Sequence, residues 1–194
     1  MPNPLKICVV EKDATRAKEI TDALHQGGWA DVTVIADDAS LTQTLASTEP
    51  DLVLIDLANP RRDTLETLSE ASGARQRPVA MFVDESDPEL STAAIQAGVS
   101  AYVVGGLSGE RIRPVLETAI ARFRMMTQMQ SELEAAKKAL AERKTIDRAK
   151  GLLIQAKGLS EDEAYRLMRK AAMDQGKRLI DVAQALVTAS ELLR

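Results

Sequence analysis

Five short apolar segments alternate with amphipathic segments along the first 110 residues, and this alternation constrains the fold more than any other feature of the sequence. The apolar segments are residues 5–10, 32–35, 52–55, 79–83 and 101–104. The segments between them have helical periodicity and cover residues 14–27, 39–47, 63–74 and 88–97. Apolar strands separated by helices are typical of a parallel sheet that is covered on both faces. We therefore expect an α/β fold with a doubly wound, five-stranded parallel sheet of the flavodoxin-like type, whose ligand crevice lies at the carboxyl ends of the strands.

A long helical pattern follows this region and begins at Ile112. It contains a heptad pattern in which two seam positions are polar. Polar seam positions destabilise a coiled coil but can fix the register of its helices. The pattern predicts a coiled-coil linker helix over residues 123–142, and a homodimer formed through residues 112–145. A solvated linker helix is the alternative. The members of the heptad pattern are Phe123, Met126, Gln130, Leu133, Lys137 and Leu140.

The C-terminal segment reads as a small all-α domain of three helices over residues 135–194. Gly158 and Gly176 interrupt the helical periodicity and are expected helix stops. Ser160 and Glu163 have the spacing of a capping box, which predicts a helix that begins directly after Ser160.

The charge of the chain is distributed unevenly between its two parts. Residues 1–123 contain 11 basic and 19 acidic residues, whereas residues 124–194 contain 14 basic and 10 acidic residues. A net positive C-terminal segment favours a polyanionic partner, although solvated charges and intrahelical pairs are the alternative for any single residue. The candidate contacts to a nucleic acid are Arg143, Lys144, Arg148, Lys150, Arg166, Arg169, Lys170, Lys177 and Arg178.

Aromatic residues are scarce in the basic segment, where Tyr165 is the only one after Phe123. Proteins that bind single strands stack bases on several aromatic rings. We therefore expect recognition of a folded loop by its shape and its phosphates, and we expect Tyr165 in the core.

Several classes of function are disfavoured by composition. No apolar run approaches the ~18 residues of a membrane span, and the N-terminal segment has no signal-peptide layout. Cys8 is the single cysteine and His25 the single histidine, so neither a disulfide within the chain nor a zinc site is expected. With no catalytic constellation in view, we expect a cytoplasmic protein that is not an enzyme, uses no cofactor and contacts no membrane.

The motif R-x-x-I-x-x-A-K-G at Arg143–Gly151, followed by S-E-D-E-A-Y-R-L-M-R, resembles the ANTAR domain over about residues 135–192. This resemblance implies a three-helix, RNA-binding antitermination module that acts as a dimer. Its expected ligand is a stem-loop leader RNA ahead of a terminator.

Residues 1–122 resemble a response-regulator receiver domain. The resemblance implies that Asp56 stands at the phosphoryl-acceptor position. A working receiver also needs two acids after the first strand to hold a divalent cation, a hydroxyl after the fourth strand and a lysine after the fifth. Here these positions hold Glu11 with Lys12, Val83, and Gly105.

Lys12 is the replacement that most affects the expected chemistry. A cation about 4 Å from Asp56 would lower the pKa of its carboxyl and occupy the space of a metal ion. We therefore hypothesise a Lys12–Asp56 pair and a receiver that does not use phosphorylation. The alternative is that Lys12 points into solvent.

The combination of a receiver that lacks these residues with an ANTAR domain resembles the NasT-type regulators of nitrate and nitrite assimilation. That likeness implies control by a nitrate-sensor regulatory protein. Two other hypotheses stay open at this point: an antiterminator that a histidine kinase phosphorylates on Asp56, and a protein-interaction adaptor whose C-terminal helices bind no RNA.

Overall fold

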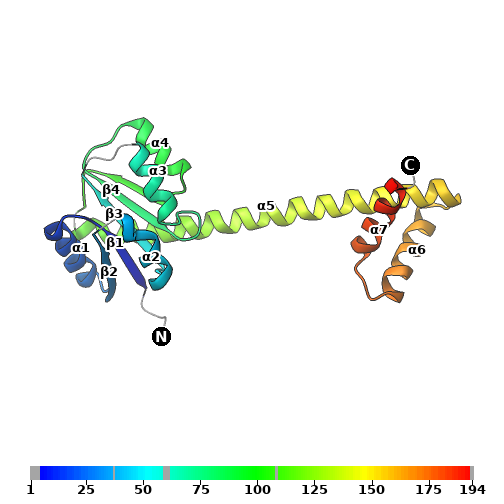
Figure 1. Cartoon of the computed structure of the whole chain (residues 1–194), viewed down its shortest axis with the longest axis horizontal. Coiled ribbons are helices and arrows are strands. Elements are labelled where there is room, and N and C mark those ends of the chain that lie inside the picture. The colour runs from blue at the N-terminus through cyan, green and yellow to red at the C-terminus, as the bar shows by residue number, and fades with distance from the viewer. Residues whose placement is uncertain (1–4, 37, 59–61, 108, 193–194) are drawn as a thin grey trace. The chain divides into compact units, whose positions relative to one another are not determined.

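The computed structural model describes residues 5–36, 38–58, 62–107 and 109–192. The chain divides into two compact units, Met1–Thr127 and Gln128–Arg194, which are described separately below. The first unit alternates strands and helices as the sequence predicts (Figure 1). Its elements are β1 (Lys6–Val10), α1 (Ala14–Gln26), β2 (Asp31–Ile35), α2 (Asp38–Thr48), β3 (Leu52–Leu57), α3 (Arg62–Ala71), β4 (Val79–Val83), α4 (Pro88–Gln96), β5 (Ala101–Val104) and the start of α5 (Gly109–Lys157).

The five strands form one parallel sheet in the order β2-β1-β3-β4-β5. This is the doubly wound, flavodoxin-like arrangement, and it confirms the predicted fold class. Because all strands are parallel, their carboxyl ends share one edge, where Glu11 follows β1, Asp56 lies near the end of β3, and Asp84 follows β4.

Helices cover both faces of the sheet, as the continuous apolar strands require. Leu41 of α2, Leu65 of α3 and Ala94 of α4 pack in one core cluster. Ile20 of α1 and Leu116 of α5 pack in the other. The first turns of α5 therefore belong to the core of the first unit.

This placement corrects the expected dimer segment. Ile112, Leu116 and Ala119 are buried in their own unit, so their side chains are not available for a seam between two copies. Beyond this part of α5, large apolar side chains are exposed. They are Met125, Met126, Met129, Leu133 and Leu140.

The second unit is a three-helix bundle built from the end of α5, α6 (Glu161–Asp174) and α7 (Leu179–Leu192). The predicted capping box is present, since Ser160 Oγ accepts from the Glu163 backbone N–H and Glu163 Oε2 accepts from the Ser160 N–H. Gly158 and Gly176 both have positive φ, which explains the helix stops. The core is small and consists of Ala149, Leu153, Ala164, Met168, Ala183 and Val187.

Candidate functional site

Asp56 is the buried acid at the carboxyl edge of the sheet. It lies in the central strand β3, and only 3% of its surface is exposed. Its Oδ1 is buried and accepts no hydrogen bond within the described part of the chain. A carboxylate in such a place needs a neighbouring cation if it is to stay ionised.

Arg16 is that cation. It comes from the first turn of α1, which Asp13 caps by accepting hydrogen bonds from the Thr15 and Arg16 backbone N–H groups. Arg16 Nη2 lies 2.8 Å from Asp56 Oδ2, and Arg16 Nε donates to the same oxygen at 3.0 Å.

The same guanidinium reaches two further acids. Arg16 Nη1 donates to Asp84 Oδ2 at 3.0 Å, and Arg16 Nε lies 3.7 Å from Glu11 Oε2. Glu11 Oε1 in turn accepts from the Asp13 N–H at 2.8 Å, so Glu11 is linked to the same helix start. Arg16 therefore contacts acids at the carboxyl ends of three different strands.

Burial decides the protonation behaviour of Asp56. Loss of water is the largest influence and raises the pKa of Asp56, Arg16 lowers it, and the nearby Glu11 carboxyl raises it; together they move this pKa from 3.8 to about 6. The expectation that a neighbouring cation would hold this pKa low is therefore wrong, because the desolvation is larger. For the more exposed Asp84, the hydrogen bond from Arg16 lowers the pKa.

A cavity of about 460 Å³ opens beside this cluster. Arg16, Asp56 and Asp84 line it together with Gly105 and Gly106. Gly106 has φ +70°, and a Cβ there would lie 2.9 Å from Asp84 Oδ1. Glycine at this turn therefore keeps room for the Asp84 carboxylate.

The structure adds Asp84 and Arg16 to the predicted pocket residues. Val83 is fully buried and packs in the hydrophobic core, so the next residue, Asp84, takes the place at the edge of the sheet. Lys12 is exposed, and Arg16 forms an ion pair with Asp56. Lys12 belongs to the loop after β1, whereas the long side chain of Arg16, in the first turn of α1, reaches all three acids.

Divalent cations do not fit this arrangement of side chains. The Arg16 guanidinium lies among Glu11, Asp56 and Asp84, where a receiver of the expected type would hold its metal. Within the described residue ranges, no group of three or more His, Cys, Asp or Glu side chains could hold a metal ion. Arg16 thus supplies the positive charge of this site.

The predicted RNA contacts fall into two sets in the second unit. The first set is held by carboxylates: Lys150 Nζ lies 2.7 Å from Asp147 Oδ1 and 2.7 Å from Glu161 Oε1. Arg148 pairs with Glu191 at 2.9 Å, and Arg178 pairs with Asp181 at 3.0 Å. Lys150 is only 15% exposed and links α5 to α6, so its main visible role is structural.

The second set is exposed and has no ion pair among the described residues. On α6 it forms one strip on the side opposite the buried Ala164 and Met168. The set consists of Arg143, Lys144, Arg166, Arg169, Lys170 and Lys177.

Tyr165 differs from the prediction that it lies in the core, and Gly151 is a second residue of this unit with an unexpected environment. Tyr165 is 41% exposed and not a core residue. Gly151 lies inside α5, where a Cβ would meet no described atom within 4 Å. Glycine inside a helix costs roughly 0.5–1 kcal/mol relative to alanine, so packing within this unit does not explain Gly151.

No helix in the described part of the chain is long and apolar enough to cross a membrane.

The sequence matches two domain families. Residues 7–117 match the response regulator receiver domain, and residues 134–187 match the ANTAR domain.

Three similar proteins are named as regulators. The transcriptional regulatory protein PdtaR of Mycobacterium tuberculosis is 30% identical over 184 residues, which are 95% of this chain and 90% of that protein. The aliphatic amidase regulator of Pseudomonas aeruginosa is 27% identical and covers 66% of this chain and 65% of its own length. The nitrate regulatory protein of Klebsiella oxytoca is 39% identical over 69 residues, only 36% of this chain and 17% of that protein.

Solved structures resemble the first unit. The BeF3-activated receiver domain of Klebsiella pneumoniae RstA has a TM-score of 0.51 and 23% identity, and covers 59% of this chain and 97% of that chain. The chemotaxis protein CheY4 of Vibrio cholerae has a TM-score of 0.53 and 18% identity, and covers 60% of this chain and 99% of its own. These likenesses show the fold of the first unit.

Proposed function

Because this chain belongs to the response regulators that join a receiver domain to an ANTAR domain, we propose that it is a transcription antiterminator that binds stem-loop leader RNA and is released by a partner protein, not by phosphorylation. The observation that carries the second half of this proposal is the contact of Arg16 with Asp56 and Asp84. The RNA-binding role follows from the ANTAR family and from the exposed cations of the second unit.

The strip on α6 is the first part of the proposed RNA surface. Arg166, Arg169 and Lys170 lie at positions i, i+3 and i+4, so they share one face of the helix. Each is exposed, and none has an ion pair in the described residues. Neutralising phosphates with such cations releases counterions, which gives both affinity and salt dependence.

A strip on α5 is the second part. Lys144 and Gly151 lie seven residues apart on the side of the helix opposite the buried Ala149, and Arg148, which also pairs with Glu191, lies beside them. The two cations flank backbone that has no side chain at Gly151, which allows a phosphate or ribose to approach the helix closely.

Gly151→Ala separates an RNA role from a structural one. If an RNA backbone approaches this helix, the variant binds a leader hairpin more weakly although its bundle becomes more stable by about 0.5–1 kcal/mol. Electrophoretic shift with a hairpin leader RNA measures the first effect, and thermal unfolding followed by circular dichroism measures the second. Unchanged RNA affinity would remove the α5 strip from the proposal.

The α6 strip is tested by its salt dependence. Arg169→Ala with Lys170→Ala should lower the slope of log affinity against log salt by about one for each phosphate that these side chains neutralise. Lys138→Ala, an exposed lysine of α5 outside the two strips, is the matched control and should leave the slope unchanged. If hairpin RNA gives no salt-dependent shift even with the unsubstituted chain, the adaptor hypothesis replaces the RNA role.

Phosphorylation of Asp56 can be measured directly. Incubation with acetyl phosphate and Mg²⁺, followed by intact mass, should leave the chain unmodified, because the hydroxyl and lysine positions hold Val83 and Gly105 and because Arg16 lies among the acids. A stoichiometric species heavier by about 80 Da, absent from Asp56→Asn, would support the kinase-controlled alternative instead.

We further propose that the partner protein is a nitrate sensor. Its support is the 39% identity over 69 residues to the nitrate regulatory protein of Klebsiella oxytoca. Co-purification of the chain with a nitrate-sensor protein, and separation of the two on addition of nitrate, is the expected result. A complex that persists when nitrate is added would support the partner protein but exclude nitrate as the signal.

The proposed dimer uses a revised stripe on α5. Met126, Met129, Leu133, Ala136 and Leu140 follow steps of three and four and are all apolar and exposed. In this arrangement Gln130 and Lys137 flank the contact between the two helices, whereas the heptad pattern in the sequence predicted them within that contact. Two parallel copies would then set Glu132 of one helix opposite Lys137 of the other, an attractive pair that favours parallel pairing in register.

A further inference from the structure

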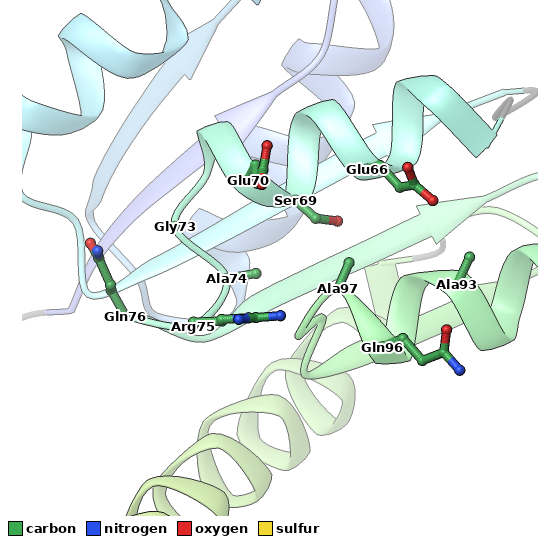
Figure 2. A pocket seen from close by; sticks show the side chains of 10 residues that line it. All are labelled: Glu66, Ser69, Glu70, Gly73, Ala74, Arg75, Gln76, Ala93, Gln96 and Ala97. Atoms are coloured by element: carbon green, nitrogen blue, oxygen red, sulfur yellow. The ribbon is translucent and has the colours of Figure 1, made fainter.

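A second cavity lies in the receiver unit, between α3 and α4 (Figure 2). Its volume is about 490 Å³. Residues 73–76, in the segment between α3 and β4, form one wall. Because the strands are parallel, this cavity lies at the amino-terminal edge of the sheet, opposite the edge that carries Asp56 and Arg16.

Small residues keep the cavity open. Ala93 of α4 and Ala97, the C-cap of that helix, lie four residues apart, and Gly73 and Ala74 line the cavity from the segment after α3. None of these side chains is long enough to fill the space between the two helices. Ligand sites in proteins typically have volumes of roughly 300–1,000 Å³, so the size suits a small molecule.

Ser69 provides a buried polar group without a partner. It is 2% exposed and lines the cavity from α3, yet its Oγ has no hydrogen bond within the described residues. Figure 2 shows this side chain on the side of α3 that faces α4. Buried hydroxyls nearly always find a partner, so this one points to an external group.

Charges of both signs surround the same space. Glu70 and Arg75 line it, and neither has an ion pair in the part of the chain that is described. A Cβ at Gly98 would lie 3.3 Å from Arg75 Cγ, so the aliphatic part of Arg75 lies against bare backbone. The guanidinium then reaches toward the Ala97 end of α4 in Figure 2. Gln76 and Gln96 add two carboxamides.

We propose that this cavity binds a small zwitterion of the α-amino-acid class. The carboxylate of the ligand pairs with Arg75, its ammonium group pairs with Glu70, and Ser69 Oγ receives or donates the hydrogen bond that it lacks in the chain alone. An anion would use only Arg75 and a simple amine only Glu70, whereas a zwitterion satisfies both. Such a site gives the receiver a small-molecule input that is separate from Asp56 and from the proposed sensor partner.

The test uses the full chain and the twenty standard L-amino acids at millimolar concentration. The readout is the unfolding midpoint of the receiver unit, followed through Trp29, the only tryptophan of the chain. A ligand that binds the folded state raises this midpoint in proportion to the logarithm of its concentration over Kd. At least one amino acid is expected to do so, and none doing so would overturn the proposal.

Variants and analogues then locate the site. Arg75→Gln and Ala97→Leu should each weaken binding about tenfold or more, whereas Arg122→Gln, an exposed arginine of the same unit, should not. Retained binding in both cavity variants would place the ligand elsewhere and reject this site. Equal binding of the analogue that lacks the amino group would reject the zwitterion.

Ser69→Ala distinguishes a ligand role from a structural one. Removing a buried hydroxyl that has no partner should raise the midpoint of the unbound protein and at the same time weaken the binding of the amino acid. A lower midpoint together with unchanged binding would assign Ser69 to structure alone and contradict its part in the site.

Discussion

Replacing Asp56 by asparagine should stabilise the receiver unit at neutral and alkaline pH. Burial outweighs the ion pair with Arg16 and leaves the pKa of this carboxyl raised from 3.8 to about 6, so the folded state favours the uncharged form. The stability that depends on this preference is complete below about pH 4 and is lost as the pH rises through 6. At pH 8 the ionised carboxylate therefore weakens the fold, and an asparagine, which does not ionise, removes that effect.

The size follows from the shift. A difference of about two pKa units, at roughly 1.4 kcal/mol for each unit, amounts to about 3 kcal/mol. This is an upper value for the substitution, because Asp56→Asn also removes the ion pair with Arg16, which keeps Asp84 as a partner. We expect a gain of about 1–3 kcal/mol at pH 8 that declines to about zero near pH 4.

Urea unfolding between pH 4 and pH 8 measures this difference. Trp29 is partly buried in the receiver core and is the only tryptophan, so its fluorescence reports this unit and not the C-terminal bundle. Asp22→Asn is the matched control: it makes the same chemical change at an exposed position of α1, and its effect should be small at every pH.

One result would refute the reasoning. If Asp56→Asn destabilises the unit at pH 8 and the loss shrinks as the pH falls toward 4, then Arg16 outweighs burial and the pKa of Asp56 is lowered. That outcome would restore the sequence-based expectation of a carboxylate held ionised by its cation, with Arg16 in the place proposed for Lys12.

Three further predictions concern the helices beyond the receiver core. Leu133→Glu should convert a dimer into a monomer in size-exclusion chromatography with light scattering, whereas Ala135→Glu, on the opposite side of α5, should not; dimers in both variants would discard the stripe. Ser160→Ala should cost the C-terminal bundle about 1 kcal/mol in unfolding free energy, since it removes one half of the capping box. Lys150→Ala should lower the thermal midpoint of the same bundle by circular dichroism, because Lys150 links Asp147 of α5 to Glu161 of α6; a midpoint equal to that of Lys138→Ala would show that the two ion pairs contribute nothing measurable.

The order of elements in both units could be predicted from local patterns. The strand over 79–83 and the helix over 88–97 differ by no more than one residue from β4 and α4. The cap at Ser160 was equally predictable, because a capping box involves residues three apart.

The candidate site was predicted only in part. Asp56 and Gly105 were found through the resemblance of residues 1–122 to a receiver domain, which expects functional residues at the ends of β3 and β5. Asp84 also follows a strand directly, and that position was the signal that could have found it. Arg16 carries no comparable signal, since one of several cations near the start of a helix looks like any surface residue.

For the candidate RNA-binding residues, too, the sequence did not show which side chains form ion pairs. Composition indicated a basic segment, yet the three cations that pair with carboxylates and the six that have no ion pair among the described residues are of the same residue types. Lys150 pairs with Glu161, eleven residues away on another helix, and no helical periodicity predicts that contact.

The sequence alone determined the parallel sheet, the long helix and the three-helix bundle, because strand and helix periods, caps and stops act between residues close in the chain. The tertiary structure alone decided which cation meets Asp56, in which direction its pKa moves, and which side chains surround the cavity between α3 and α4. Arg16 bonds to acids 40 and 68 residues away, and such contacts depend on the edge of the sheet that brings them together. Desolvation likewise depends on what the whole unit packs around a group, which no local pattern in the sequence contains.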